Sequence, residues 1–202
     1  MTHQGHSFPH NLSKSWYQRL ADDLAAELEA HTGEKRSTIE EMRRFLAVKG
    51  CHQLFDRMQA AREGKERDEA LKSVARIMRA YALERPALFA ATLRTIAADS
   101  PEWREAVGQI RKFLISLFAE CGLYGAAAEQ AQRILKCIVR GFVLHELMDY
   151  FLDPVSYEES YEDAILVFLT GLPALVCRDQ ETARPRSLRR SARVVERARL
   201  TP

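Results

Sequence analysis

The 202-residue sequence lacks the features that mark secreted and membrane-bound proteins. Its first ten residues, MTHQGHSFPH, contain no hydrophobic core of a signal peptide. A membrane-spanning helix needs about 18 or more apolar residues with few or no charges, and no charge-free run of that length occurs. These absences predict a cytoplasmic protein that does not enter a membrane.

Cysteine is scarce and scattered. None of the four cysteines forms a C-x-x-C pair or stands close to histidine at a metal-ligand spacing, and each lies inside or beside an apolar helical pattern. The sequence therefore predicts reduced thiols in the core, with no structural metal, disulfide or cofactor. The four are Cys51, Cys121, Cys137 and Cys177.

Catalytic motifs are also missing. There is no G-x-S-x-G, no phosphate-binding glycine loop, no H-E-x-x-H and no paired acidic motif in a glycine-rich loop. His145-Glu146 resembles half of a zinc motif, but Asp149 stands four positions after His145 where the second histidine would be. We therefore expect that the protein is not an enzyme. His145 is then either a core histidine with a polar neighbour or a polar group on the wall of a ligand pocket.

No stretch alternates apolar and polar residues long enough to predict a strand, whereas apolar residues recur at spacings of three and four throughout. The expected fold class is all-α, with about seven helices. Gly50 suggests a kink in the second helix, and the Ser100-Pro101 capping signal opens the fifth, which Cys121-Gly122 closes. The other six helices are expected near residues 16–31, 37–58, 71–82, 87–97, 134–152 and 157–176.

The segment at residues 134–152 is the most apolar helix, with thirteen apolar positions out of nineteen. Its apolar side chains fall on two stripes, so both faces need cover. Asp153-Pro154 ends this helix, and a capping box of Ser156 and Glu159 opens the next one. Two consecutive helices with this much apolar surface predict a helical hairpin that packs against its copy across a two-fold axis.

Charge is unevenly distributed along the chain. The net charge is +2, yet the stretch from Arg184 to Arg199 holds seven arginines and one glutamate, giving +6 there and −4 elsewhere. This arginine-rich tail, residues 184–202, could contact phosphates. It lacks interleaved aromatic residues, so a solvated, disordered end remains the alternative.

From about residue 68 to residue 175 the sequence resembles the C-terminal regulatory region of TetR/AcrR-type transcriptional regulators. In the subgroup with a Trp/His-Gly-Phe-Val motif followed by Leu-Glu, the matching residues here read RGFVLHEL from Arg140 to Leu147. YEESYED follows from Tyr157, with Gly171-Leu172 further on. Upstream, AYALERPALF from Ala80 to Phe89 is similar to the family segment in which a helix ends at proline and resumes with an aromatic residue.

The resemblance implies a TetR-like regulatory domain that forms a homodimer and binds a small, apolar effector within each subunit. The C-terminal hairpin would form an intersubunit four-helix bundle, and the effector would modulate DNA binding. Helical phase then assigns the pocket wall to Phe89, Leu93, Trp103, Phe113, Leu117 and His145. It assigns the dimer interface to Leu144, Leu147, Phe151, Tyr161, Phe168 and Leu172.

The sequence departs from the family at its N-terminal, DNA-binding head. In one alignment, residues 7–14 (SFPHNLSK) resemble the end of the recognition helix, and residues 16–31 form the connecting helix. In the other, residues 37–58 form the connecting helix. Neither alignment supplies a full helix-turn-helix, so we assign residues 1–36 to a remnant or diverged head and residues 37–183 to the regulatory domain. A helical dimer that binds only a ligand or partner is the alternative function.

Overall fold

The structure is a computed structural model that describes residues 16–30, 39–93, 100–147 and 156–183, all but a few of which lie in helices. The described part contains seven helices and no strand, which confirms the all-α prediction. They are α1 (Trp16–Ala30), α2 (Ile39–Arg62), α3 (Arg67–Glu84), α4 (Pro86–Thr92), α5 (Pro101–Glu120), α6 (Gly125–Leu147) and α7 (Tyr157–Ala183).

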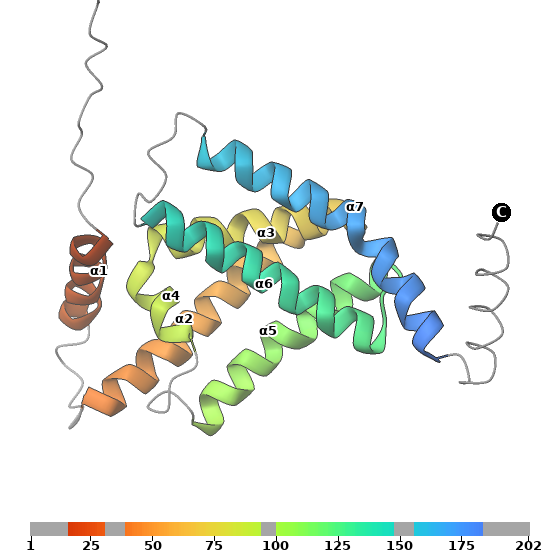
Figure 1. Ribbon diagram of the computed structural model, residues 1–202. Helices are drawn as coiled ribbons and strands as arrows, with labels where there is room; N and C mark the ends of the chain where they lie inside the picture. Colours follow the sequence, from red (N-terminus) through yellow and green to blue (C-terminus); the bar gives the residue numbers. More distant parts are fainter. Residues whose placement is uncertain (1–15, 31–38, 94–99, 148–155, 184–202) are drawn as a thin grey trace, which may run out of the picture.

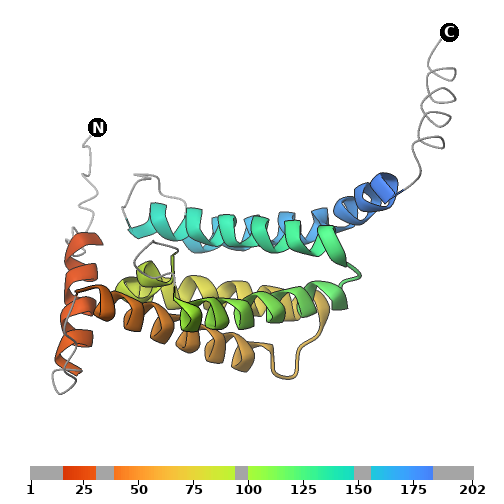
Figure 2. The same cartoon turned by 90° about the horizontal axis from the view of Figure 1, so that it is seen from below.

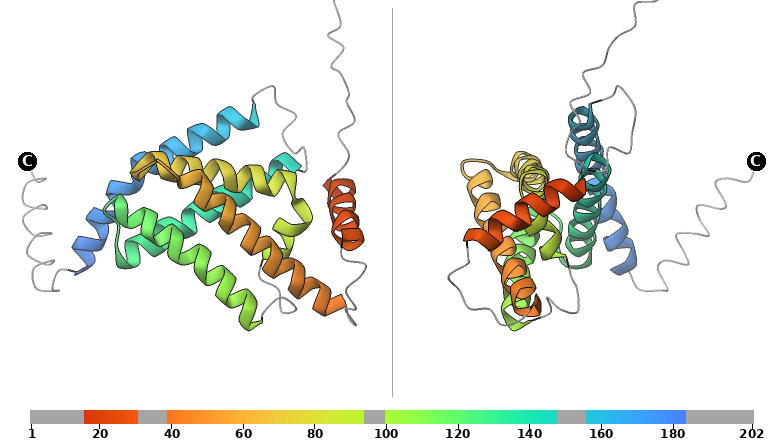
Figure 3. Two further views of the ribbon diagram at one scale, coloured as in Figure 1. Left: turned by 180° about the vertical axis from the view of Figure 1, so that it is seen from behind. Right: turned by 90° about the vertical axis from the view of Figure 1, so that its left-hand side faces the viewer.

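The helices form two layers, with α1 across one end (Figure 1). Figure 2 shows α6 and α7 side by side in one layer and α2 to α5 in the other. The right-hand view of Figure 3 looks along these layers and shows that none of the other described helices covers the outer face of α6 and α7. The hydrophobic core fills the space between the layers, where Phe118 of α5 meets Phe168 of α7 edge to face at 6.1 Å between ring centroids.

Helix α3 joins the two layers through both buried and exposed contacts. The hydroxyl of the buried Tyr161 on α7 donates to the Ala75 carbonyl at 2.7 Å. Arg79 holds Glu146 of α6 through two bonds of 2.9 Å, and Arg76 holds Glu162 of α7. Paired donors on one guanidinium fix orientation as well as distance, so these arginines set how the α6–α7 layer sits on α3.

Helices α2 and α4 approach each other closely at Gly50. A Cβ atom at this position would lie 2.7 Å from the Leu88 carbonyl oxygen and 3.0 Å from the Thr92 methyl group. Helix α2 continues through Gly50 without a break, and the kink stays a prediction. The glycine is needed here for the space that it leaves to α4.

Helix α7 carries apolar residues on its exposed face as well as on its buried face. By length and composition alone the segment Tyr157–Cys177 could cross a membrane, with a mean hydropathy of 1.4, although core helices of soluble proteins pass the same test. Only 28% of this window is buried, because one face packs on α6 and the other is exposed. Pro173 lies inside the helix, which extends beyond the expected end at residue 176, and Figure 2 shows its last turns bending away from α6.

Several other expectations differ from the structure. Helix α4 ends at Thr92, earlier than the predicted residue 97, and α6 begins at Gly125, earlier than residue 134. The prediction that all four thiols lie in the core is wrong for Cys137 and Cys177, which are exposed, and Cys121 is half-buried. Both exposed cysteines lie on amphipathic helices whose solvent face is itself rich in apolar residues, and the apolar pattern therefore misplaced them.

The contact at Gly50 generates a stability prediction. Alanine favours helix by about 0.5–1 kcal/mol over glycine, but at position 50 it would press on backbone, and overpacking of a core costs about 1–3 kcal/mol. We expect Gly50→Ala to lower the free energy of unfolding in urea. The control Gly108→Ala on α5, where a Cβ meets nothing within 4 Å, should raise it. An equal increase in the free energy of unfolding for both variants would contradict the close contact between Gly50 and α4.

Candidate functional site

A cavity of about 220 Å³ lies where five helices converge. Its walls are mainly apolar and include an aromatic residue from each of α4 and α5. Two cationic side chains of α6 stand at one side. The lining residues are Cys51, Leu54, Met78, Phe89, Thr92, Trp103, Val107, Ile110, Lys136, Val139 and Arg140.

The α5 wall is built by helical spacing from a fixed start. Ser100 caps the helix by accepting a hydrogen bond from the Trp103 backbone N–H at 3.2 Å, and Pro101 occupies its first turn. Residues spaced by four and three then present Trp103, Val107 and Ile110 to the cavity. The cap therefore determines which side of α5 the indole ring occupies.

Helix α4 closes another side. It begins at Pro86, immediately after α3, and its Phe89 and Thr92 reach the cavity. The Thr92 hydroxyl donates to the Phe89 carbonyl at 2.7 Å. Because Gly50 has no Cβ, α4 can lie close to α2 at Thr92, which is one of the residues that line the cavity.

Polar groups at the cavity differ in charge and in partners. Burial raises the pKa of the Cys51 thiol to about 11, so this thiol is neutral at physiological pH. Burial, with the nearby Arg140 and Arg111, lowers the pKa of Lys136. The indole N–H of Trp103 is buried and has no hydrogen-bond partner in the described part of the chain. The cavity thus offers donors and positive charge, with little negative charge to meet them.

An ion-pair network ties α1 to the end of α3 next to the cavity. Arg85, between α3 and α4, donates to Asp23 at 2.8 Å and also to Glu27 on α1. Lys49 of α2 donates to Glu27 at 2.6 Å, and the Ala87 backbone N–H donates to Asp23 at 2.9 Å. Burial raises the pKa of Glu27, but the bonds from Lys49 and Arg85 outweigh it and hold the pKa below its usual value.

A second feature is the outer face of α6 and α7. On α7, Val167 is 71% exposed and Leu166 is 53% exposed, while Leu144 on α6 is 50% exposed. Ile134 and Cys137 extend this outer face along α6, and Thr170, Gly171 and Ala174 extend it along α7. An apolar patch that covers two adjacent helices is typical of a protein–protein interface.

The predicted pocket residues divide into two groups. Phe89 and Trp103 line the cavity, whereas Leu117 is fully buried in the core away from it. Phe113 is half-buried and meets Phe55 edge to face at 5.8 Å, and Leu93 is the half-buried C-cap of α4.

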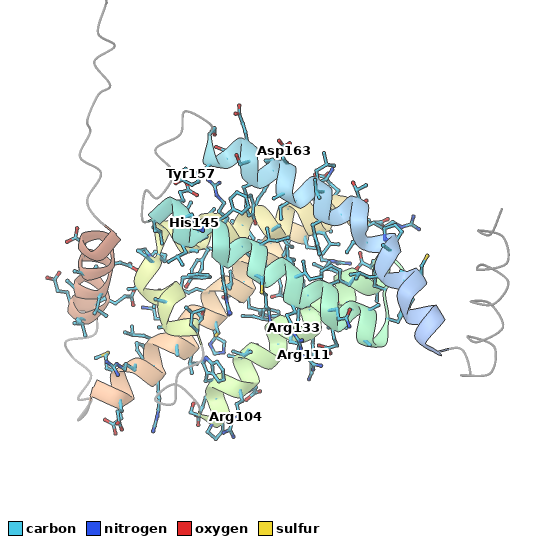
Figure 4. The ribbon with its side chains drawn as sticks, viewed as in Figure 1. Arg104, Arg111, Arg133, His145, Tyr157 and Asp163 are labelled. Carbon is cyan, nitrogen blue, oxygen red and sulfur yellow. The ribbon has the colours of Figure 1, made fainter. Side chains whose placement is uncertain are left out.

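His145 also lies away from the cavity, where α6 meets α7. Figure 4 shows it beside Tyr157, whose hydroxyl donates to the His145 carbonyl at 3.3 Å. The residue belongs to the α6 stripe that includes Phe142, which contacts Tyr161 of α7 with 5.3 Å between ring centroids. This stripe faces α7, so the imidazole does not reach the wall that Val139 and Arg140 form.

The predicted dimer-interface residues are mostly buried within their own subunit. Leu147, Tyr161, Phe168 and Leu172 each expose 8% or less. Leu144 is exposed on the outer face, and Phe151 lies outside the described residues. Both sides of α7 are apolar, so helical phase could not tell the side that faces the core from the side that faces outward.

Four residues at the cavity were not assigned to a ligand site from the sequence: Lys136, Arg140, Cys51 and Gly50. A usable signal existed for the two cations. They lie four residues apart on a helix that is otherwise apolar at this point, and no acidic residue stands three or four positions from either one. Neither cation can therefore form the ion pair with an acidic residue one helical turn away that surface cations commonly form.

A larger hollow of about 610 Å³ lies at the α2–α3 turn, but it is more open to solvent. Its walls carry mainly charged residues, including Glu66, Asp68 and Glu120, and Glu120 already pairs with Arg62. In the described ranges no group of three or more histidine, cysteine or acidic side chains is placed to hold a metal ion. The apolar cavity is therefore the better candidate for a small-molecule site.

Comparison with known proteins identifies the architecture. Residues 71–168 match the family model described as "Tetracyclin repressor-like, C-terminal domain". The chain is also 25% identical over 136 residues to the uncharacterized HTH-type transcriptional regulator Rv0681 of Mycobacterium tuberculosis. The aligned part covers 67% of this chain and 62% of that relative. The matched segment contains α4, α5 and α6 complete, with most of α3 and nearly half of α7, and this part of the chain belongs to the family of tetracyclin repressor-like C-terminal domains.

Proposed function

We propose that this chain is a cytoplasmic, non-enzymatic transcriptional regulator that dimerises and binds a small-molecule effector in the cavity between α2, α3, α4, α5 and α6. The observation that carries the proposal is the position of this cavity. Nine of its eleven lining residues belong to the segment that matches the tetracyclin repressor-like domain, and Cys51 and Leu54 of α2 complete the wall. The cavity has apolar walls with a few polar groups, as ligand sites commonly do.

The contacts of α4 supply a route from the cavity to the N-terminal part of the chain. Phe89 and Thr92 line the cavity, and Arg85, which directly precedes α4, holds Asp23 and Glu27 of α1. A ligand that displaces α4 would strain or release these bonds. Binding would thus change the position of α1, provided that the ligand favours one position of α4 over the other.

Dimerisation would use the outer face of α6 and α7. The residues that carry this interface in the proposal are Leu144, Leu166 and Val167, together with their exposed neighbours on both helices. Two copies of this pair of helices would form a four-helix bundle across a two-fold axis. This arrangement keeps the predicted bundle but uses the exposed side of each helix.

The interface can be tested with Val167→Glu. The side chain is 71% exposed in the subunit, so a charge there should leave the subunit folded but oppose burial between two copies. Sedimentation at micromolar concentration should give twice 23.1 kDa for the unmodified protein and 23.1 kDa for the variant. Leu24→Glu on α1 is the control and should stay dimeric. An unmodified protein that sediments at 23.1 kDa would contradict the dimer.

DNA binding can be tested by mobility shift with the DNA that flanks the gene, at about 50 and 200 mM salt, because contacts to phosphates weaken as salt rises. The proposal expects a shift that prefers this sequence over unrelated DNA and weakens at the higher salt. A dimer that gives no such shift would instead be a ligand- or partner-binding module, the alternative that the incomplete head suggests.

A further inference from the structure

The cavity has more hydrogen-bond donors than acceptors. Trp103 is 7% exposed, and its indole nitrogen is buried without a partner among the described residues. A buried donor that no group satisfies costs free energy in the unliganded protein. A ligand that carries an acceptor into the cavity would remove this cost.

Two cations lie at the same cavity. Lys136 is half-buried and Arg140 is exposed, and they stand one helical turn apart on α6. Across the described ranges neither side chain forms an ion pair with a carboxylate, although several other arginines do. Two like charges at this spacing repel each other, and an anion between them would reverse that repulsion.

The nearby carboxylates are already engaged. Glu129 is the acidic group whose charge acts on Lys136, but it pairs with Arg111 of α5. Glu146, further along α6, is held by Arg79 through both of its oxygens. Cys51, on the α2 side, is a neutral thiol and supplies no negative charge. The positive charge at the cavity is therefore not neutralised by a neighbour across it.

We propose that the effector is a small organic acid whose apolar body fills the space beside Val107 and Ile110 and whose carboxylate lies at Lys136 and Arg140, where it can also accept from the indole N–H of Trp103. This assignment rests on the proposed function, because it takes the cavity as the effector site. A carboxylate oxygen can accept from ammonium and guanidinium groups together, and such charge-assisted bonds are stronger than neutral ones.

The cavity volume limits the size of the acid. A cavity of about 150 Å³ lined by aliphatic and aromatic residues is large enough to bind benzene, and this one measures about 220 Å³. It is smaller than the range of roughly 300–1,000 Å³ that drug-sized ligands use. One ring with a short acidic side chain, or an aliphatic chain of similar bulk, fits this limit.

The test compares charge at constant shape. Isothermal titration of the full chain uses 3-phenylpropionate, its neutral amide and the cation 3-phenylpropylamine, with benzoate, hexanoate and octanoate to vary the apolar body. At least one carboxylate should bind, and 3-phenylpropionate should bind about 10- to 100-fold more tightly than its amide. The amine should bind most weakly, since Lys136 and Arg140 repel it.

Variants then locate the carboxylate. Lys136→Met and Arg140→Gln should each reduce the preference for the acid over the amide, while Lys136→Arg should retain it. Arg133→Gln is the matched control, because Arg133 is an exposed arginine on α6 that does not line the cavity (Figure 4). Circular dichroism and thermal unfolding of each variant verify that it is folded.

The outcomes separate the two proposals. If the amide or the amine binds as tightly as the acid, and Ile110→Trp abolishes that binding, the cavity is an effector site but the assignment to an organic acid is wrong. If no probe binds the folded protein, both the acid assignment and the effector site are overturned. If the acid binds but Arg133→Gln lowers the affinity for the acid as much as Lys136→Met does, the carboxylate does not lie at Lys136 and Arg140.

Discussion

The close packing of α4 against α2 is the constraint on which the candidate site depends. Because Gly50 has no side chain, the Leu88 carbonyl can approach the α2 backbone. The same placement brings Phe89 and Thr92 to the cavity and puts Arg85 within reach of α1. Any side chain at position 50 would have to push α4 outward, which would alter the cavity and the α1 contacts together.

The sequence predicted the helices well where capping chemistry was explicit. Ser100 and Pro101 located the start of α5, and Ser156 located the start of α7. The bounds were less accurate where such signals were missing. Helix α6 begins at Gly125, and both Gly122 and Gly125 have positive φ at the connection that precedes it. The apolar run that begins at residue 134 did not predict the helical residues before it.

The sites were harder to predict, because apolar periodicity finds a buried face without saying what covers it. Tyr161 and Val167 are both apolar positions of α7, yet one packs on α3 and the other is exposed. The choice between them depends on the partner helix, which lies far away in the sequence. Trp103 and Phe89 were found because helical phase placed these aromatic side chains on the pocket side of their helices. Lys136 and Arg140 were missed because isolated cations are ordinarily assigned to the solvent.

The network around Arg85 also links the position of α1 to the proton concentration. The folded protein holds the pKa of Glu27 below its usual value, so the unfolded or undocked carboxyl binds a proton more readily. The bonds to Lys49 and Arg85 therefore contribute fully above the ordinary carboxyl pKa and are lost as pH falls through the lowered value. Acid should accordingly weaken the contact of the first helix with the rest of the subunit, whereas the apolar side chains of the core carry no group that takes up a proton.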